Sequence, residues 1–359
     1  MRHKHSDYMH WAKTQSRARF NLATSSVGSF PLAELGALPA RETGGDSTYG
    51  YAPLQRAIAA KCGVDPDCVV AAAGTSMANH LAMAALIDPG DEVLIEHPAY
   101  ELLISAALYL GAEVKRFARA EESGYALDPA EIRRALTPKT KLIVVTNLHN
   151  PSSVLTGDAV LREVGDLACS VGAHVIVDEV YLDAVYENTP RTSYLLGPEF
   201  IVTSSLTKVY GLSALRCGWI LAQPDLARAM WRLNDLFGVI PAHPAELLSV
   251  AAFEHLDRVR ERARKVVEAD RALLAEFLAH QPAVSAPSTA FGTTAFLRFD
   301  GVDVEAFLAR LRADYETTAV PGRFFEMPGH IRIGMGVNTG MFGEGLRRID
   351  LALTGRPLR

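Results

Sequence analysis

Between residues 68 and 222, short β-branched runs alternate with segments of helical pattern, and this alternation limits the possible folds more than any other feature. Such an order is typical of a parallel sheet covered on both faces. The expected strands are Cys68–Ala73, Val93–Glu96, Lys141–Thr146, His174–Asp178, Phe200–Thr203 and Cys217–Ala222. We therefore predict an α/β fold with a mostly parallel central sheet, whose ligands bind at the carboxyl ends of the strands.

After Pro244 the pattern changes to a long helical stretch, which we expect to link two lobes. It covers roughly residues 245–280, and its apolar stripe consists of Leu256, Val259, Val266, Leu273 and Phe277. A strand near 294–299, a helix near 304–315 and a strand near 330–337 follow it. These elements predict a smaller α+β lobe beside the large one.

The domain organisation expected from this pattern has three parts. Residues 1–43 form an N-terminal arm and part of the small domain, 44–269 form the large domain, and 270–359 form the C-terminal small domain. Within the arm, Tyr8 and Trp11 indicate one helix that packs on a neighbour.

The composition does not favour a macromolecular partner. A formal net charge of −5 gives no general positive field for nucleic acid or an anionic membrane. The four cysteines show no paired spacing, so neither a metal site nor a disulfide framework is predicted. No run is long enough to span a membrane, and no signal-peptide pattern is found. We expect a cytoplasmic protein that acts on small molecules.

Lys208 stands in a segment that suits covalent chemistry with a carbonyl compound. It follows the strand that begins at Phe200, with Ser205 and Thr207 before it and Arg216 after it. Nearby positive charge and partial burial favour a neutral amine, and hydroxyls together with an arginine can bind phosphate. Taken alone, the segment fits a solvated surface lysine equally well.

The run Ser-Leu-Thr-Lys at 205–208, with Arg-Cys-Gly at 216–218, resembles the pyridoxal phosphate (PLP) signature of class I/II aminotransferases in the aspartate aminotransferase superfamily. Further motifs of that family follow in the same order across residues 21–347. The resemblance implies a fold type I PLP-dependent transferase in which Lys208 carries the cofactor as a Schiff base. It also implies that the cofactor phosphate is bound by Ser205, Thr207 and Arg216.

A second part of the phosphate site is expected where Gly74, Thr75 and Ser76 join a strand to a helix. Free N–H groups at a helix start attract an anion, glycine permits close approach, and Thr75 adds a hydroxyl donor. Many such turns only cap a helix. The resemblance to the small-residue phosphate loop of the family assigns all three residues to the cofactor.

Asp178 ends an apolar strand, where a carboxylate is tolerated only when it is paired. A helix cap or a surface carboxylate is the alternative interpretation. The resemblance pairs Asp178 with the pyridinium nitrogen, which keeps the ring able to accept electrons. Tyr181 resembles the family tyrosine that binds the 3′ oxygen. Lys208, Asp178 and Tyr181 are therefore the expected catalytic residues.

Asn150 and Tyr100 are expected to flank the cofactor ring. The segment around Asn150 resembles the family's Asn-Pro-x-Asn-Pro-Thr-Gly, which implies contact with the 3′ oxygen and with the substrate. Leu148 replaces the first proline and Ser152-Ser153 replace Thr-Gly, so we expect a different local turn. Tyr100 matches an aromatic that stacks on the ring, although the residue taken alone is more typical of a core or rim.

Arg332 lies inside an apolar strand-like run, where an unpaired guanidinium is costly. It therefore needs an anion, and a structural ion pair is one way to supply it. The resemblance instead implies that Arg332 holds the substrate carboxylate in bidentate fashion.

Tyr49 resembles the tyrosine that the family offers to the phosphate of the partner subunit, and Tyr51 is the second choice. This implies a homodimer with shared active sites. The stretch 236–244 has no arginine where dicarboxylate-specific relatives carry one, so aspartate specificity is not favoured. Phe237 and Val239 suit an apolar or aromatic substrate side chain, and they suit interface packing equally.

The function predicted from the resemblance is transfer of an amino group from an L-amino acid to a 2-oxo acid. A carbon–sulfur lyase acting by β-elimination is the alternative enzyme, because the same scaffold supports elimination, racemisation and ring-forming replacement. A non-catalytic PLP-binding regulatory module is a third hypothesis, although too few residues precede Asn21 for a DNA-binding domain. A nicotinamide dehydrogenase is excluded, because the first strand is followed by a single glycine.

Overall fold

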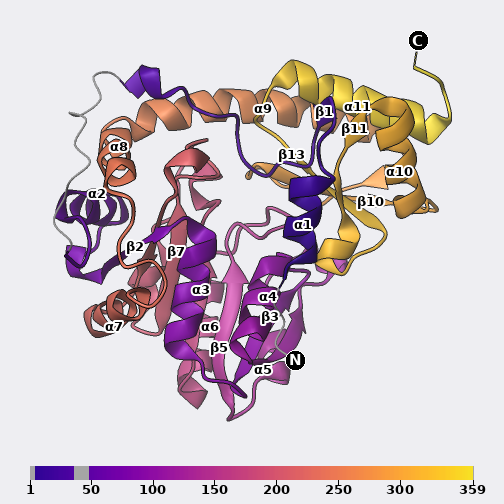
Figure 1. Ribbon diagram of the computed structural model, residues 1–359. Coiled ribbons are helices and arrows are strands. Elements are labelled where there is room, and N and C mark those ends of the chain that lie inside the picture. Colours follow the sequence, from indigo (N-terminus) through magenta and orange to yellow (C-terminus); the bar gives the residue numbers. More distant parts are fainter. Residues whose placement is uncertain (1–4, 36–47, 359) are drawn as a thin grey trace.

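The structure is a computed structural model that describes residues 5–35 and 48–358. Its centre is a seven-stranded sheet (Figure 1). In spatial order the strands are β2 (Val69–Ala73), β8 (Cys217–Leu221), β7 (Phe200–Ser205), β6 (His174–Asp178), β5 (Thr140–Thr146), β3 (Glu92–His97) and β4 (Glu113–Ala118). Strand β8 runs antiparallel to both neighbours, and the other adjacent pairs are parallel.

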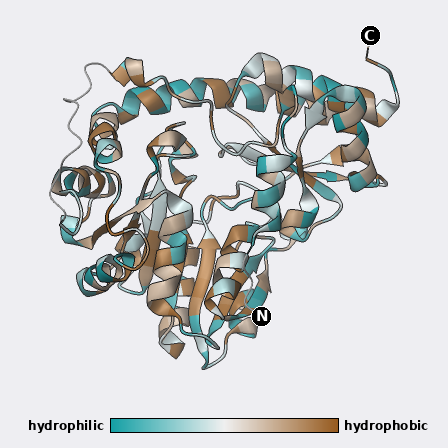
Figure 2. Ribbon diagram, in the orientation of Figure 1, coloured by the Kyte–Doolittle hydropathy of each residue, from teal (hydrophilic) through white to brown (hydrophobic). Residues whose placement is uncertain are grey.

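Both faces of this sheet are covered. In β3 the consecutive residues Val93, Leu94 and Ile95 have no exposed surface, and successive side chains of a strand point to opposite faces. Figure 2 shows central strands that are strongly hydrophobic and surrounding helices of mixed character. These helices are α2 (Ala52–Cys62), α3 (Thr75–Leu86), α4 (Glu101–Leu110), α5 (Pro129–Ala135), α6 (Asp158–Val171) and α7 (Pro224–Asn234).

A smaller α+β lobe has its own hydrophobic core, to which Phe307, Ile331 and Phe342 contribute. Its antiparallel sheet has the order β12 (Val320–Pro321), β13 (His330–Gly334), β10 (Thr294–Phe299) and β9 (Val284–Ser285). A separate parallel pair joins β1 (Phe20–Asn21) to β11 (Thr317–Thr318). The helices of this lobe are α10 (Val304–Tyr315) and α11 (Thr339–Thr354).

Two helices occupy the stretch that the sequence predicts as one. Helix α8 (His243–Phe253) ends before α9 (Leu256–His280) begins, because His255 between them leaves the helical conformation, with φ −125° and ψ 14°. The predicted stripe was also partly wrong. The buried positions of α9 are Val259, Ala263, Val267, Asp270, Leu274 and Phe277. Since Val259 joins the large core and Phe277 the small one, α9 links the two lobes (Figure 1).

The N-terminal segment binds to both lobes. Helix α1 (Asp7–Thr14) packs near α4, and we call the extended residues 22–30 that follow β1 the strap. The strap amides of Val27 and Phe30 donate to the carbonyls of Lys208 (3.0 Å) and Gly211 (3.1 Å) in the large lobe. Gly28 N donates to Gly336 O (2.8 Å) of the small lobe. The strap therefore crosses the boundary between the lobes.

The predicted fold class, with a mostly parallel sheet and a smaller α+β lobe, is confirmed. Strand β4 was missed, because half of its sequence Glu-Val-Lys-Arg-Phe-Ala is polar, as an edge strand permits, and it forms no apolar run. The three domain ranges stay a prediction, and the boundary at 43/44 lies outside the described residues. Among the described residues, no helix is long and apolar enough to cross a membrane.

Candidate active site

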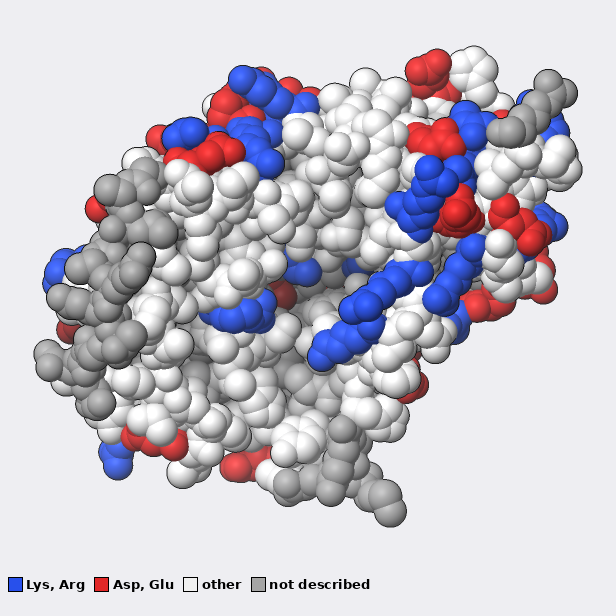
Figure 3. All heavy atoms as spheres, turned by 45° about the horizontal axis from the view of Figure 1, so that its top comes forward, with Lys and Arg blue, Asp and Glu red and all other residues white. Residues whose placement is uncertain are grey.

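A cavity of about 390 Å³ lies at the edge where the carboxyl ends of β2, β5, β6 and β7 meet the start of β8. The parallel strands bring Thr146 and Asp178 to its floor, and the strap and α1 close its other side. Figure 3 shows this face hollowed, with Lys and Arg side chains gathered around the hollow. The arrangement matches the rule that open α/β sheets bind ligands at strand ends.

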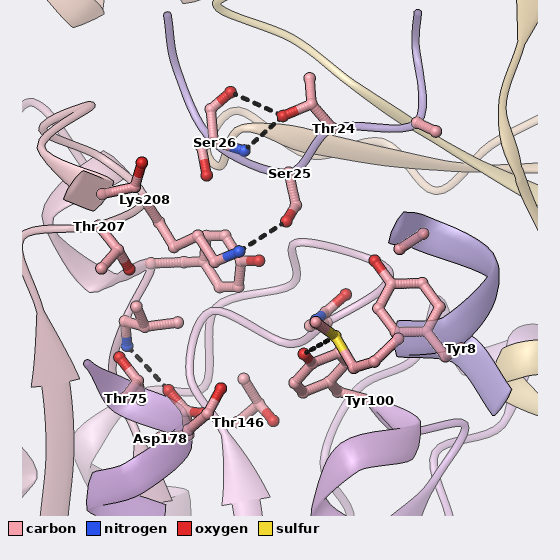
Figure 4. A pocket seen from close by; sticks show the side chains of 18 of the residues that line it. Tyr8, Thr24, Ser25, Ser26, Thr75, Tyr100, Thr146, Asp178, Thr207 and Lys208 are labelled. Carbon is pink, nitrogen blue, oxygen red and sulfur yellow. Dashed lines mark hydrogen bonds between the residues drawn. The ribbon is translucent and has the colours of Figure 1, made fainter. Parts of the chain in front are cut away.

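Lys208 points into this cavity. Its Nζ donates to Ser25 Oγ of the strap at 3.0 Å (Figure 4). Burial lowers the pKa of the Lys208 amine, and the positive charge of Arg332 acts in the same direction. The neutral, nucleophilic form of the amine is therefore favoured relative to an exposed lysine.

Asp178 faces the cavity as a buried carboxyl. Its oxygens accept from Asn79 Nδ2 at 2.8 Å and from the amide of Val180 at 3.1 Å. Asn79 is oriented in turn by Thr203, whose Oγ1 donates to Asn79 Oδ1 at 2.5 Å. Burial raises the pKa of Asp178 to about 6, against these hydrogen bonds. The carboxyl is thus held rigidly and is poised for a cationic partner.

A cradle of hydroxyls and one guanidinium lies at the start of α3. Thr75 Oγ1 donates to Ser205 Oγ at 2.7 Å, and Ser205 Oγ lies 2.6 Å from Thr207 Oγ1. Arg216 donates to the carbonyls of Ala73 (3.0 Å) and Ser213 (3.3 Å), and it has no ion pair with any described carboxylate. These donors converge on a place suited to an anion.

Gly74 makes the close approach in this cradle possible. Its φ is +81°, and a Cβ built on it would lie 2.2 Å from Arg216 Nη2. Any other residue would therefore displace the guanidinium. Ser76, next along α3, lines the cavity.

Arg332 on β13 is completely buried. Its Nη1 donates to Asn150 Oδ1 at 3.0 Å and its Nη2 to Tyr8 Oη at 2.8 Å, while its Nε has no partner. No carboxylate of the described chain pairs with it. Tyr8 and Asn150 lie on the cavity wall, and Arg332 lies behind them. A buried cation without a counter-ion points to an anionic ligand.

Tyr181 and Tyr100 also line the cavity. Burial raises the pKa of Tyr181, and a hydrogen bond with the Ser25 hydroxyl lowers it in part. Tyr100 precedes α4, and its ring meets that of Tyr8 edge to face at 5.5 Å. Its hydroxyl contacts Met9 Sδ at 3.4 Å (Figure 4).

The turn that carries Asn150 has unusual backbone geometry. The Asn147–Leu148 peptide is cis, and Ser153, where the family pattern has glycine, has φ 63°. His149 bridges Pro98 O (2.9 Å) and Ser152 Oγ (2.6 Å) inside the turn. The different residues at these positions still bring Asn150 to the cavity wall.

Comparison with known protein families matches residues 37–349 to the model of aminotransferase class I and II. The chain belongs to this family. The predicted recognition is therefore confirmed, and the protein is a PLP-dependent enzyme.

Individual relatives of this aminotransferase-family protein carry different names. Capreomycidine synthase from Streptomyces vinaceus is 30% identical over 93% of this chain and 90% of its own length. Arginine–pyruvate transaminase AruH from Pseudomonas aeruginosa is 26% identical over 80% of this chain and 75% of its own. Its relatives thus include a transaminase and a synthase.

Solved structures of the family superpose closely. A PLP-dependent aminotransferase from Streptococcus suis matches with a TM-score of 0.90 and 25% identity, covering 100% of both chains. The PLP-dependent cyclase OrfR matches with a TM-score of 0.90 and 25% identity, covering 99% of this chain and 98% of its own.

The residues of this family member fit PLP in three places. The cradle around Arg216 has donors that no described carboxylate neutralises, Asp178 accepts hydrogen bonds from neutral groups only, and Lys208 offers an amine in the same cavity. These are the complements of a phosphate, a protonated ring nitrogen and an aldehyde. Within residues 5–35 and 48–358, no group of three His, Cys, Asp or Glu side chains is placed to hold a metal.

One predicted site residue lies apart from the cavity. Tyr49 is 55% exposed, and its hydroxyl donates to Asp235 Oδ2 at 3.1 Å. The structure therefore does not bring Tyr49 to the site of its own chain.

Sequence reasoning missed Tyr8, Ser25, Asn79 and Thr146, all of which line the cavity. The sequence did contain a signal for Asn79, because this residue lies one helical turn after Thr75 and therefore on the same face of α3. Tyr8 was predicted only as a packing residue, and Ser25 has no local signal because its partner is 183 residues away.

Proposed function

We propose that this protein transfers the amino group of an L-amino acid to a 2-oxo acid, with Lys208 as the residue that binds the cofactor covalently and carries the substrate proton. The observation that carries the proposal is the Lys208 amine itself. It shares a cavity with the buried carboxyl of Asp178, which has no cationic partner among the described residues, and with the anion donors around Arg216, and burial lowers its pKa. A lysine that only stabilised the fold would instead pair with a carboxylate.

PLP, when bound, supplies an electron-accepting ring that weakens the bonds to Cα of an attached amino acid. Gly74, Thr75, Ser76, Ser205, Thr207 and Arg216 would hold its phosphate. Asp178 would hold a positive charge at the ring nitrogen, while Tyr181 and Asn150 would bind the 3′ oxygen. Tyr100 would lie against the ring.

Lys208 is suited to proton transfer. Its amine is neutral in a larger fraction of molecules than a solvent-exposed lysine, so it can accept the Cα proton. The amine can return the proton to another atom within its reach, because its Nζ is anchored from one side by Ser25.

Arg332 and Asn150 are proposed to bind the substrate carboxylate. The carboxylate would take the place of the Tyr8 hydroxyl at Arg332 Nη2, so that an anion replaces a neutral acceptor on a buried cation. Tyr8 belongs to α1, which must shift to admit it.

A homodimer with shared active sites is part of the proposal. The exposed side chains of Phe237 and Tyr109 both contact His80, with ring centroids 5.5 and 5.8 Å apart, and Leu236 and Val239 extend this apolar surface. Apolar patches of this kind mark association surfaces. Tyr49, anchored to Asp235 next to the patch, would contribute to the partner's phosphate cradle in such a dimer.

Elimination followed by ring closure is the second candidate, and one observation favours it. The relative named as a synthase has higher identity and coverage than the named transaminase above, and a solved neighbour of equal TM-score is called a cyclase. Such a reaction needs a leaving group at Cβ and a nucleophile on the same side chain. The carbon–sulfur lyase alternative shares the elimination step.

The test uses the purified protein, the Lys208→Ala variant, and Lys265→Ala as a matched control for an exposed lysine on α9. The visible absorption of the cofactor is followed while amino acids and then 2-oxo acids are added. We expect the wild type and Lys265→Ala to lose the band with an amino acid and to regain it with a 2-oxo acid. Lys208→Ala should do neither.

Three other outcomes would each reject transamination. Release of ammonia without any 2-oxo acid would identify elimination. A cyclic product from an amino acid with a β-leaving group would identify the synthase-type reaction. A band that no amino acid changes would favour the non-catalytic module.

A further inference from the structure

We infer that Ser25 is a catalytic residue of this site, which holds and orients the free amine of Lys208 for proton transfer. The inference rests on the proposed role of Lys208 and adds a residue from a different part of the chain. Ser25 is 7% exposed and lies on the strap, and its Oγ accepts a hydrogen bond from Lys208 Nζ at 3.0 Å. The contact therefore involves the reacting atom itself.

The position of Ser25 is fixed by backbone contacts on both sides. Thr293 Oγ1 of the small lobe donates to Ser25 O at 3.0 Å, and Val27 N, two residues further along, donates to Lys208 O at 3.0 Å. The strap is therefore tied to Lys208 at two points, through Ser25 Oγ at the lysine side chain and through Val27 N at the lysine main chain. Such double fixation is what precise orientation of a flexible four-carbon side chain requires.

Ser25 also connects Lys208 to Tyr181. A hydrogen bond with the Ser25 hydroxyl lowers the pKa of Tyr181, against the rise that burial causes. A serine hydroxyl accepts one hydrogen bond and donates another at the same time. While the Ser25 oxygen accepts from Lys208 Nζ, the Ser25 proton remains available toward Tyr181, so that one side chain orients the amine and influences the phenol.

Lys208 must have a free amine during turnover in order to accept and return a proton. In this form Nζ has only Ser25 as a hydrogen-bond acceptor among the described residues. Loss of the hydroxyl would leave a rotatable amine in a cavity, and misplacement of about 1 Å can cost up to about 100-fold in rate.

The test compares Ser25→Ala with Ser25→Thr, which keeps the hydroxyl, and with Ser170→Ala, which removes an exposed hydroxyl from α6. The first measurement is the rate at which the full-length protein, stripped of cofactor, captures added PLP at different pH values. Borohydride reduction and mass spectrometry confirm capture at Lys208. The second is exchange of the Cα hydrogen of an amino acid with deuterated water by the loaded enzyme.

We expect both rates to fall about 10- to 100-fold in Ser25→Ala and to return in large part in Ser25→Thr. In Ser25→Ala the rise of the PLP capture rate with pH should occur at lower pH. The charged form of the Lys208 amine loses a hydrogen-bond acceptor there, so the pKa of the amine falls. A purely structural role of Ser25 would leave the pH dependence of the capture rate unchanged. Ser25→Cys, which keeps the shape with a weaker hydrogen bond, replaces Ser25→Ala if that variant does not fold.

Unchanged rates in Ser25→Ala, or equal losses in the alanine and threonine variants, would overturn the inference. The capture rate depends only on the amine and not on the reaction that follows. A protein that captures PLP with the expected Ser25 dependence, but needs no 2-oxo acid for turnover, would therefore refute transamination and leave the role of Ser25 standing.

Discussion

At the scale of single residues, the site keeps two buried charges without a counter-ion. Asp178 and Arg332 each have hydrogen bonds to neutral groups only, among the residues that the structure describes. Burial of an unpaired charge destabilises a fold. The sequence therefore retains groups that weaken the empty protein and become favourable when a ligand supplies the opposite charge.

Asp178→Asn should stabilise the cofactor-free protein above pH 6. The pKa of Asp178 rises from 3.8 to about 6 in the fold, so its ionisation costs about 3 kcal/mol at pH 7 to 8. A raised pKa means that the cost grows as the pH rises from 4 to 6 and is absent below 4. Urea unfolding at pH 4 and pH 8 measures the difference, which should be present only at pH 8.

The same substitution should lower turnover of the loaded enzyme by about 100-fold or more, because a preorganised charge is lost. Asp225→Asn, at a fully solvated carboxylate on α7, is the control and should change neither quantity. A loss of stability at pH 8 in Asp178→Asn would show that the ionised carboxylate does not destabilise the cofactor-free protein.

Tyr8→Phe should have opposite effects on stability and on substrate binding. It removes the acceptor of Arg332 Nη2 and should lower the free energy of unfolding by about 1 to 3 kcal/mol. The incoming carboxylate then no longer displaces a hydroxyl, so KM for the amino acid should fall about tenfold, in line with the same hydrogen-bond energy. Thermal unfolding measures the expected loss of stability, and steady-state kinetics measure the expected fall in KM. A rise in KM would instead place the hydroxyl within the carboxylate site.

The sequence could predict those site residues whose position follows from the residues next to them in the chain. Asp178 and Thr75 end or follow apolar strands, and the structure places both at the cavity. Ser25 and Tyr8 act through partners far away in the chain, so no local pattern identifies them. Their roles depend on how the strap and α1 cross the completed sheet.

At the scale of elements, the strap depends on glycines that leave space for its backbone. A Cβ on Gly334 would lie 1.7 Å from Thr24 O, which is backbone and cannot rotate away. The strap segment must therefore move if any side chain is present there. Because Ser25 follows Thr24 directly, its contact with Lys208 would move as well.

Gly334→Ala should consequently lower the free energy of unfolding by about 1 to 3 kcal/mol, as overpacking does. It should also slow PLP capture by Lys208. Gly157→Ala is the matched control, because nothing lies within 4 Å of its added Cβ. Denaturant unfolding and the capture rate give the two readouts, and equal behaviour of the two variants would show that the strap is not held by this contact.

Elements with a strong apolar pattern were predicted well, whereas their ends and partners were not. β10 and α10 have the expected bounds, since alternation and helical periodicity act within one segment. The break between α8 and α9 could not be predicted, because no glycine or proline lies between the two helices. The strap has no periodicity, because its hydrogen bonds run to loops of both lobes.

At the scale of the whole molecule, the exposed apolar surface around Phe237 and the position of Tyr49 suggest a test of shared active sites. In a two-fold dimer each site would combine Lys208 of one subunit with Tyr49 of the other. Lys208→Ala and Tyr49→Phe would then damage the same site from different chains. Each variant alone should give a homodimer with two defective sites.

Co-expression of the two variants should restore activity. A mixed dimer has one site with both defects and one site in which Lys208 and Tyr49 are both intact. Random pairing makes about half of the dimers mixed, so about one quarter of wild-type activity should return. If Tyr49 served its own chain, every site in the mixture would carry a defect and the activity would not exceed the mean of the two parents. Differently tagged chains, purified in tandem, allow the mixed dimer to be measured alone, where the recovery should reach about half.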